Sequence, residues 1–347
     1  MTRSHYEGRV LGSLATACIG DALGAPTEQR TISEIRALWG GRVERFETPP
    51  PDSPFAKGRA AGQITDDASQ MLALVDAYIE SNGRLTAVAV ATALLRWADD
   101  EEYSRFMGPS TRAGIERLRA GGDPTETGRA GRLTTEGTSN GAAMRIASVG
   151  LAHPGDLEGA VSDAMIACLP THATTLAISG AAAVAGAIAI AMEPDARLMD
   201  VIRAARRGAA LGAAAGLQHG RDVAGPTVVA RLDRALELVV NASDFDHAIE
   251  RLAGGVGTGL HISEAVPAAL AIFLAADGDP FLTVVGGANA GDDTDTIACI
   301  AGSIAGAFKG IEAVPQDLYE QVEAANHLRL AERASTFTRI VLESARA

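Results

Sequence analysis

The chain has 347 residues, and its 30 basic and 43 acidic side chains give a formal net charge of −13. This acidic balance disfavours attraction to polyanions, which argues against nucleic acid or an anionic membrane as a general partner, although a small phosphate-bearing ligand is still allowed. Apolar residues make up 47% and aromatic residues only 4%, so the core must consist of Ala, Leu, Ile and Val, which favours closely packed helices.

No charge run or low-complexity stretch indicates a linker, so we expect one domain over residues 1–347. Cys18, Cys168 and Cys299 lie among apolar neighbours without paired spacing. They are expected to be reduced core residues of a cytoplasmic protein. The N-terminal residues lack the apolar segment of a signal peptide.

The first predicted helix covers residues 10–19 and ends in residues 20–28, where two glycines and a proline turn the chain. Glu28 is then a carboxylate on a loop, either solvated or functional. Residues 46–64 are rich in proline and glycine and are predicted to form a mobile loop that acts as a lid.

An acidic motif, Thr65-Asp66-Asp67, lies at the start of a predicted helix whose apolar stripe includes Met71 and Val75. Residues 85–97 are predicted as the next helix and residues 111–118 as a short one. The acids at positions 99–102 between them are typical of a solvated surface.

Another helical segment is preceded by a short, mostly polar stretch: Thr138, Ser139, Asn140 and Gly141. Hydroxyls, an amide and free backbone N–H groups at a helix start suit a phosphate group, but an ordinary N-cap uses the same residue types.

His172 precedes a segment of small and apolar residues, 176–192. The histidine either binds a sugar hydroxyl or fills the core. The segment is mostly Ala and Gly, which favours a buried helix over a membrane span. Further helices are predicted at residues 198–217, 228–240, 245–252 and 263–276 and from residue 317 onward, with no β-alternation of useful length.

Residues 286–310 contain the densest acidic motif, Asp292-Asp293-Thr294-Asp295-Thr296, followed by an apolar helical stripe. Carboxylates at a helix start are stabilised by its dipole, but three of them within four positions repel one another unless they share a cation. Oxygen ligands of this kind suit magnesium or manganese. The alternative is that Asp292 is an N-cap and the other acids are solvated.

The two acidic motifs have the same design, because each combines acids with Thr at a helix start. If they face each other, they can hold one or two divalent ions. Other chemistries lack their motifs: the chain has no His-Glu-x-x-His, no Gly-x-Ser-x-Gly and no Walker lysine loop. An isoprenoid synthase is disfavoured because Asp66-Asp67 is not followed by its third acid and aromatic residues are few.

Five stretches resemble, in order, the motif series of the ADP-ribosylglycohydrolases: residues 20–28, 65–67, 140–145, 171–172 and 291–296. The resemblance covers about residues 10–310. It implies an all-α fold, a compact orthogonal multi-helix bundle. It also implies a hydrolase that uses two divalent ions, Mg²⁺ or Mn²⁺, to cleave the glycosidic bond between an ADP-ribosyl or related ribosyl group and a protein or small molecule.

The resemblance also implies roles for residues at matching positions. The metal ligands would be Thr65, Asp66, Asp67, Asp293, Asp295 and Thr296. Glu28 would be the family's mobile acid and would act in catalysis with Asp67 and Asp293. Residues 138–141 would hold the diphosphate, and His172 would lie near the nucleotide.

One position departs from the pattern of the dinitrogenase reductase type, because Phe106-Met107-Gly108 stands where those enzymes have Asp-Ile-Gly. The linkage therefore stays open between arginine, serine, O-acetyl, nucleic-acid and other ribosyl compounds. The alternative function is a catalytically idle ADP-ribose binder or a crystallin-like structural protein. The complete set of ligands favours an enzyme.

Overall fold

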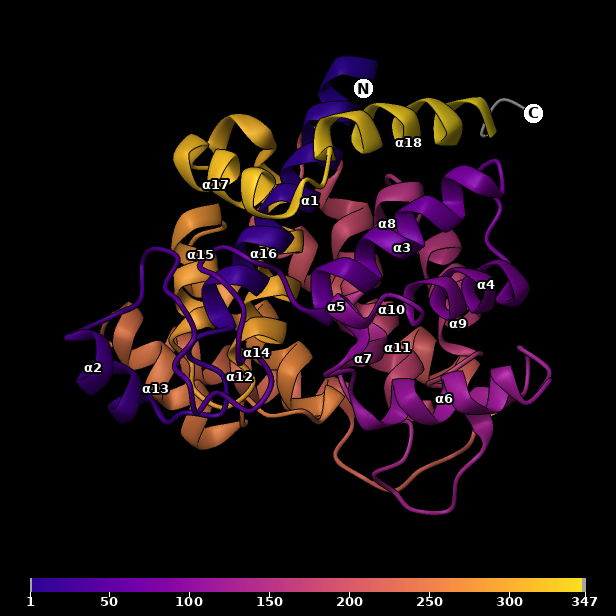
Figure 1. Cartoon of the computed structure of the whole chain (residues 1–347), viewed down its shortest axis with the longest axis horizontal. Coiled ribbons are helices and arrows are strands. Elements are labelled where there is room, and N and C mark those ends of the chain that lie inside the picture. Colours follow the sequence, from indigo (N-terminus) through magenta and orange to yellow (C-terminus); the bar gives the residue numbers. More distant parts are fainter. Residues whose placement is uncertain (1, 345–347) are drawn as a thin grey trace.

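The computed structural model describes residues 2–344, and within them the regular elements are helices (Figure 1). Two isolated bridges, Ser139 to His261 and Thr174 to Arg221, are the β-type pairings recorded there. The predicted all-α class is confirmed. The α-helices are α1 (Arg3–Gly24), α2 (Ile32–Trp39), α3 (Asp66–Glu80), α4 (Ala87–Trp97), α5 (Glu101–Ser104), α6 (Pro109–Arg119), α7 (Gly141–Met144), α8 (Ala147–Ala152), α9 (Leu157–Cys168), α10 (Thr175–Ala191), α11 (Leu198–His219), α12 (Val228–Val240), α13 (Phe245–Gly255), α14 (Ile262–Ala275), α15 (Pro280–Ala288), α16 (Thr294–Lys309), α17 (Gln316–Asn326) and α18 (Leu330–Ser344), with short 3-10 helices η1 (Thr127–Arg129) and η2 (Ile311–Ala313).

The centre of the fold is the pair α1 and α16, which lie side by side along much of their length. Glycines allow this close approach. A Cβ atom on Gly24 would lie 2.5 Å from the backbone of Asp295, and one on Gly306 would overlap the carbonyl group of Gly12. The close packing brings the end of α1 against the start of α16, where the acids lie.

A second close pair, α10 and α11, builds the other half of the core. Every residue of α10 is buried except Ile190, as expected for a helix of small apolar residues packed on all sides. No helix within residues 2–344 is both long and apolar enough to cross a membrane.

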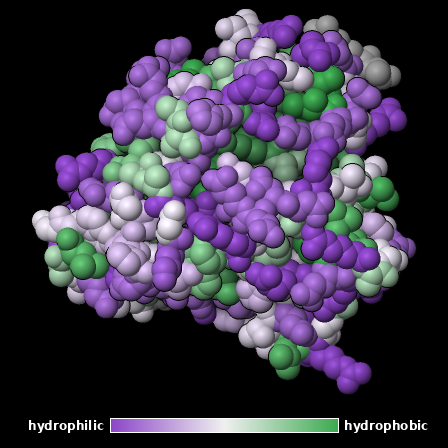
Figure 2. All heavy atoms as spheres, in the orientation of Figure 1, coloured by the Kyte–Doolittle hydropathy of each residue, from purple (hydrophilic) through white to green (hydrophobic). Residues whose placement is uncertain are grey.

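The C-terminal helices α17 and α18 lie beside α1, near its N-terminal end (Figure 1). Arg333 of α18 forms an ion pair with Asp76 of α3, at 3.1 Å. The face shown in Figure 2 is mostly hydrophilic, with hydrophobic residues in small separate groups.

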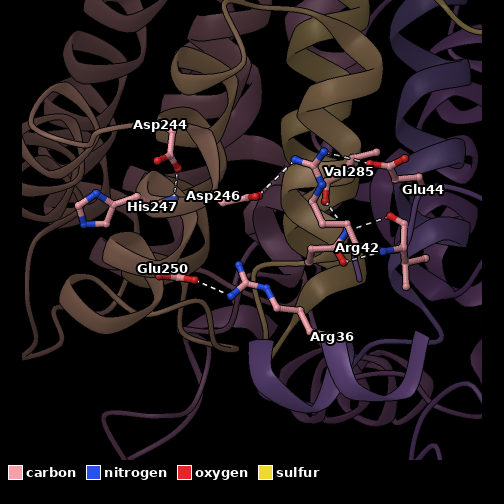
Figure 3. A network of polar contacts seen from close by, with 10 residues as sticks. Arg36, Arg42, Glu44, Asp244, Asp246, His247, Glu250 and Val285 are labelled. Atoms are coloured by element: carbon pink, nitrogen blue, oxygen red, sulfur yellow. Dashed lines mark hydrogen bonds and ion pairs between the residues drawn. The ribbon is translucent and has the colours of Figure 1, made fainter. Parts of the chain in front are cut away.

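Polar contacts fasten the segment between α1 and α3 to the helices beneath it (Figure 3). Arg36 pairs with Glu250 at 2.6 Å and Arg42 with Asp246 at 3.2 Å, but exposed pairs of this kind contribute little. The stronger contact is buried: the side chain of Asn289 accepts from the N–H of Val43 at 2.8 Å and donates to its carbonyl at 2.9 Å. This clamp ties the segment to the end of α15.

One predicted helix boundary is wrong for a physical reason, and other elements differ from the prediction. The helix predicted to end near residue 19 continues to Gly24, because its glycines serve close packing against α16 rather than termination. Residues 286–310 form the end of α15, a turn and then α16. The alternative with Asp292 as N-cap is also wrong: Asp293 occupies that position, and Asp292 precedes it at φ 61°. Helices α2, α5, α9 and α15 were not predicted.

Other predictions are confirmed. The three cysteines are buried and free, acids 99–102 are exposed, and two helices follow residue 315. Residues 46–64 contain no helix, while their role as a lid stays a prediction.

We predict that Gly24→Ala destabilises the protein by about 1–3 kcal/mol, because the new Cβ would overlap the backbone of Asp295. Denaturant unfolding measures the effect. The matched control is Gly8→Ala on the same helix, where the nearest atom is 3.8 Å away and the change should be neutral or stabilising. Equal stability of the two variants would contradict the packing argument.

Candidate active site

The two acidic motifs and Glu28 meet in one cavity of about 450 Å³. Glu28 follows α1, while the acids of the other two motifs lie at the starts of α3 and α16. The lining includes all the predicted metal ligands and three of the four residues of the predicted phosphate-binding loop: Glu28, Thr65, Asp66, Asp67, Ser139, Asn140, Gly141, Asp293, Asp295 and Thr296. Segments far apart in the sequence thus converge as the motifs indicated.

The carboxylates are crowded and largely buried. Oxygen atoms of Glu28, Asp293 and Asp295 lie within 4.8 Å of one another. One oxygen each of Glu28 and Asp67 is buried without a hydrogen-bond partner. Buried polar atoms without partners are costly and rare. The unpartnered Asp67 oxygen, in the same cavity as the Asp293 and Asp295 carboxylates, fits the ligand set of a hard divalent cation.

The electrostatics of the protein alone oppose full ionisation of this cluster. Burial, followed by the charges of Asp295 and Asp293, raises the pKa of Glu28 well above its ordinary value. Burial and the nearby Asp21 carboxylate raise the pKa of Asp66 to about 7. Burial and the neighbouring carboxylates also raise the pKa of Asp67. A bound cation would reverse these shifts by stabilising the charged forms.

Asp21 is a site residue to which the sequence analysis gave no role. Its carboxylate is fully buried and accepts hydrogen bonds from the backbone N–H groups of Thr65, at 2.9 Å, and Ala68, also at 2.9 Å. It therefore ties α1 to the start of α3 and fixes the Thr65 segment. The signal was present in the sequence, since Asp21 is the one charged residue in the apolar stretch 10–25.

Asn140 supports the opposite wall. Its side-chain N–H donates to Asp293 Oδ2 at 2.7 Å, which orients that carboxylate toward the cavity. Sequence analysis assigned Asn140 only to phosphate binding, whereas the structure places it also as a partner of a predicted metal ligand.

His172 is fully buried and does not line the cavity. Its Nε2 lies 2.9 Å from Ser139 Oγ, so it reaches the cavity through Ser139. Direct binding of a nucleotide by His172 stays a prediction.

A second cavity of about 390 Å³ adjoins the first, and both are lined by Pro109, Ser139 and Leu260. Thr138 faces this second space, which also contains Arg117 and His261. Among the described residues that line the first cavity there is no Lys, Arg or His. The cleft is therefore acidic at one end and carries basic groups at the other.

The model of the family described as ADP-ribosylglycohydrolase matches residues 2–344. The chain belongs to this family. Membership identifies the protein as a glycosyl hydrolase and agrees with the resemblance seen in the five motifs.

Similar proteins span nearly the whole chain. The uncharacterized protein YegU of Escherichia coli is 32% identical over 92% of this chain and 93% of its own length. The human ADP-ribosylhydrolase ARH3 is 26% identical over 91% of this chain and 89% of its own. A solved structure, the ADP-ribosylglycohydrolase-related protein complex, shares the fold with a TM-score of 0.69 at 24% identity, covering 97% of this chain and 99% of that one.

Replacing Asn140 with Ala should weaken Mn²⁺ binding about tenfold or more, because Asp293 loses the partner that orients it. Titration calorimetry of the metal-free protein measures this change. Asn241→Ala is the control, since the Asn241 side chain donates only to its own helix at Glu237. Unchanged Mn²⁺ affinity in a folded Asn140→Ala variant would contradict the supporting role.

The stability of the metal-free protein should fall between about pH 4 and about pH 7. The folded pKa of Asp66 is about 7 against an ordinary value of 3.8, and that of Asp21 is about 6. In this window the folded state binds more protons than the unfolded state, so rising pH favours unfolding. Added Mg²⁺ should reduce the slope, and Asp66→Asn should reduce it without metal. Metal-free stability that rises with pH would contradict these shifts.

Proposed function

We propose that the protein hydrolyses the glycosidic bond of an ADP-ribosyl group with the help of two divalent ions, Mg²⁺ or Mn²⁺. The observation that carries this proposal is the convergence of buried carboxylates, two of them with unpartnered oxygen atoms, on a cavity that continues into a second one. The family match supports glycosidic cleavage as the reaction. The name of the relative ARH3 supports an ADP-ribosyl group as the substrate.

The two ions would be held by side chains from the starts of α3 and α16: Thr65, Asp66, Asp67, Asp293, Asp295 and Thr296. When bound, such ions orient the ribose hydroxyls and lower the pKa of a water molecule. The chain itself positions these ligands through Asp21, behind Thr65, and Asn140, beside Asp293.

Glu28 is our candidate for the proton carrier. Cleavage of a ribosyl bond passes through an oxocarbenium-like state, in which the departing nitrogen or oxygen must gain a proton and water must lose one. One Glu28 oxygen is buried without a hydrogen-bond partner, and the carboxyl group lies close to Asp293 and Asp295, which suits a group that exchanges a proton at the reacting bond.

The two adjoining cavities suggest how the ligand lies. The ribose would sit over the acids, and the diphosphate would pass Ser139, which lines both spaces. The remaining nucleotide would enter the second cavity, where Arg117 and His261 are the basic residues.

The leaving group would depart past the mouth of the first cavity, where Phe55, Phe106 and Met107 are apolar. No acid stands at Phe106 to contact a guanidinium group, so we leave the linkage open between arginine, serine and other ribosyl compounds. The family match favours an enzyme over the idle-binder alternative, and loss of activity on chelation would distinguish the two.

Asp293→Asn and Asp67→Asn should each abolish release of ADP-ribose while the fold is retained, because each removes a charged ligand from the metal centre. Glu28→Gln should keep metal affinity and lose turnover. The rate of ADP-ribose release is measured with a panel of ADP-ribosylated peptides and with O-acetyl-ADP-ribose, first in chelator and then after Mg²⁺ or Mn²⁺ is added back. Asp99→Asn on the exposed surface is the control. Normal turnover of the Asp variants, or activity resistant to chelation, would refute the metal-dependent mechanism.

A further inference from the structure

Arg145 is a fully buried cation at the end of α7, and no carboxylate within residues 2–344 forms an ion pair with it. Instead, its guanidinium donates in two directions. One nitrogen donates to Gln70 Oε1 at 2.9 Å, and the other donates to Thr171 Oγ1. An uncompensated buried charge is costly, so its position between two polar networks calls for a role.

The arm through Thr171 has a fixed direction because a guanidinium can only donate. Thr171 Oγ1 accepts from Arg145. A guanidinium nitrogen of Arg145 also lies 3.3 Å from His172 Nδ1 and disfavours a hydrogen on that atom, so the Thr171 hydroxyl donates to Nδ1 at 2.7 Å. The acceptor Nδ1 leaves the proton of the neutral ring on Nε2. Nε2 then donates to Ser139 Oγ at 2.9 Å. The hydroxyl hydrogen of Ser139 is left for the cavity.

The arm through Gln70 is equally directed. Since Gln70 Oε1 accepts from Arg145, its amide cannot be flipped, and its Nε2 donates to Asp66 Oδ2 at 3.2 Å. Gln70 is fully buried. One cation therefore orients groups on both sides of the cleft, at Ser139 and at Asp66.

The opposite direction is disfavoured by the same geometry. A proton on His172 Nδ1 would face Arg145, whose guanidinium nitrogen is 3.3 Å away. Burial and the Arg145 charge also lower the pKa of His172 well below its ordinary value, which keeps the ring neutral. Gly141 packs against the ring, since a Cβ there would lie 3.1 Å from Nε2, and this contact holds the ring in place.

We propose that Arg145 is a positioning residue that makes Ser139 a hydrogen-bond donor to a phosphate oxygen of the ligand and holds the Asp66 carboxylate through Gln70. In this role His172 acts through Ser139. The identity of the ligand rests on the proposed function, whereas the direction of the hydrogen bonds rests on Arg145 alone.

The direction is tested without substrate by nitrogen NMR of protein labelled at histidine, with His172 assigned by its loss in His172→Gln. We expect the ring to be the neutral form with hydrogen on Nε2 at neutral pH. A ring with hydrogen on Nδ1, or a charged ring, overturns the proposal. Because this readout needs no ligand, it is independent of whether ADP-ribose is the substrate.

The effect on binding is tested with Thr171→Val, a change of nearly equal volume that breaks the arm. The affinity of this variant for ADP-ribose in the presence of Mg²⁺ should fall about tenfold. The affinity of Ser139→Ala should fall equally, because each change removes the Ser139 hydroxyl as a directed hydrogen-bond donor. The double variant should fall no further than Ser139→Ala, since both act through one contact. Thr338→Val is the control, because Thr338 is also fully buried but lies on α18 and its hydroxyl has no partner.

If the folded Thr171→Val variant binds ADP-ribose as tightly as the wild type does, or if the losses in the double variant are additive, the proposal is overturned. Binding of ADP-ribose by the wild type would still uphold the proposed function in that case. The reverse result, a hydrogen on Nε2 but no ADP-ribose binding by the wild type, overturns the proposed ligand and its contact with Ser139 and upholds the directed network. Thermal unfolding of each variant establishes that loss of binding is not loss of fold.

Discussion

Repulsion among buried carboxylates is the constraint on which the rest of this structure depends. One cavity is lined by acids from the starts of α3 and α16 and by Glu28, which follows α1. Burial raises the pKa values of these acids. Without a cation, such a cluster needs a rigid surround to hold the acids together. The surround consists of the glycine contacts between α1 and α16, the Asp21 cap on α3 and the Asn140 contact to Asp293.

The same constraint explains where the fold is tightest. Small residues let α1 approach α16 until the backbone at Gly24 touches that of Asp295, so the position of a site residue is set by main-chain packing rather than by a flexible side chain. Such packing favours precise ligand geometry, because the supporting elements are helices.

Sequence reasoning gave the all-α class and indicated which segments meet, whereas the roles of the site residues stay predictions. The acids beside Thr at two helix starts indicated that the two segments meet, because carboxylates so close together repel one another unless they share a cation. The end of the first helix was wrong because Gly20 and Gly24 were interpreted as terminators, and sequence alone does not distinguish a glycine that ends a helix from one that admits a neighbour. The roles of Asp21 and Arg145 also escaped prediction, since each depends on partners more than 25 residues away.

The central claim is that metal ions and ADP-ribose bind together at the acidic cluster. The most direct test is thermal unfolding of metal-stripped protein with ADP-ribose, Mg²⁺ or Mn²⁺, and both together, because a ligand of the native state raises the midpoint by mass action. The account predicts a large rise only when metal and ADP-ribose are both present. A rise with ADP-ribose that is the same in chelator, or no rise under any of these conditions, would contradict it.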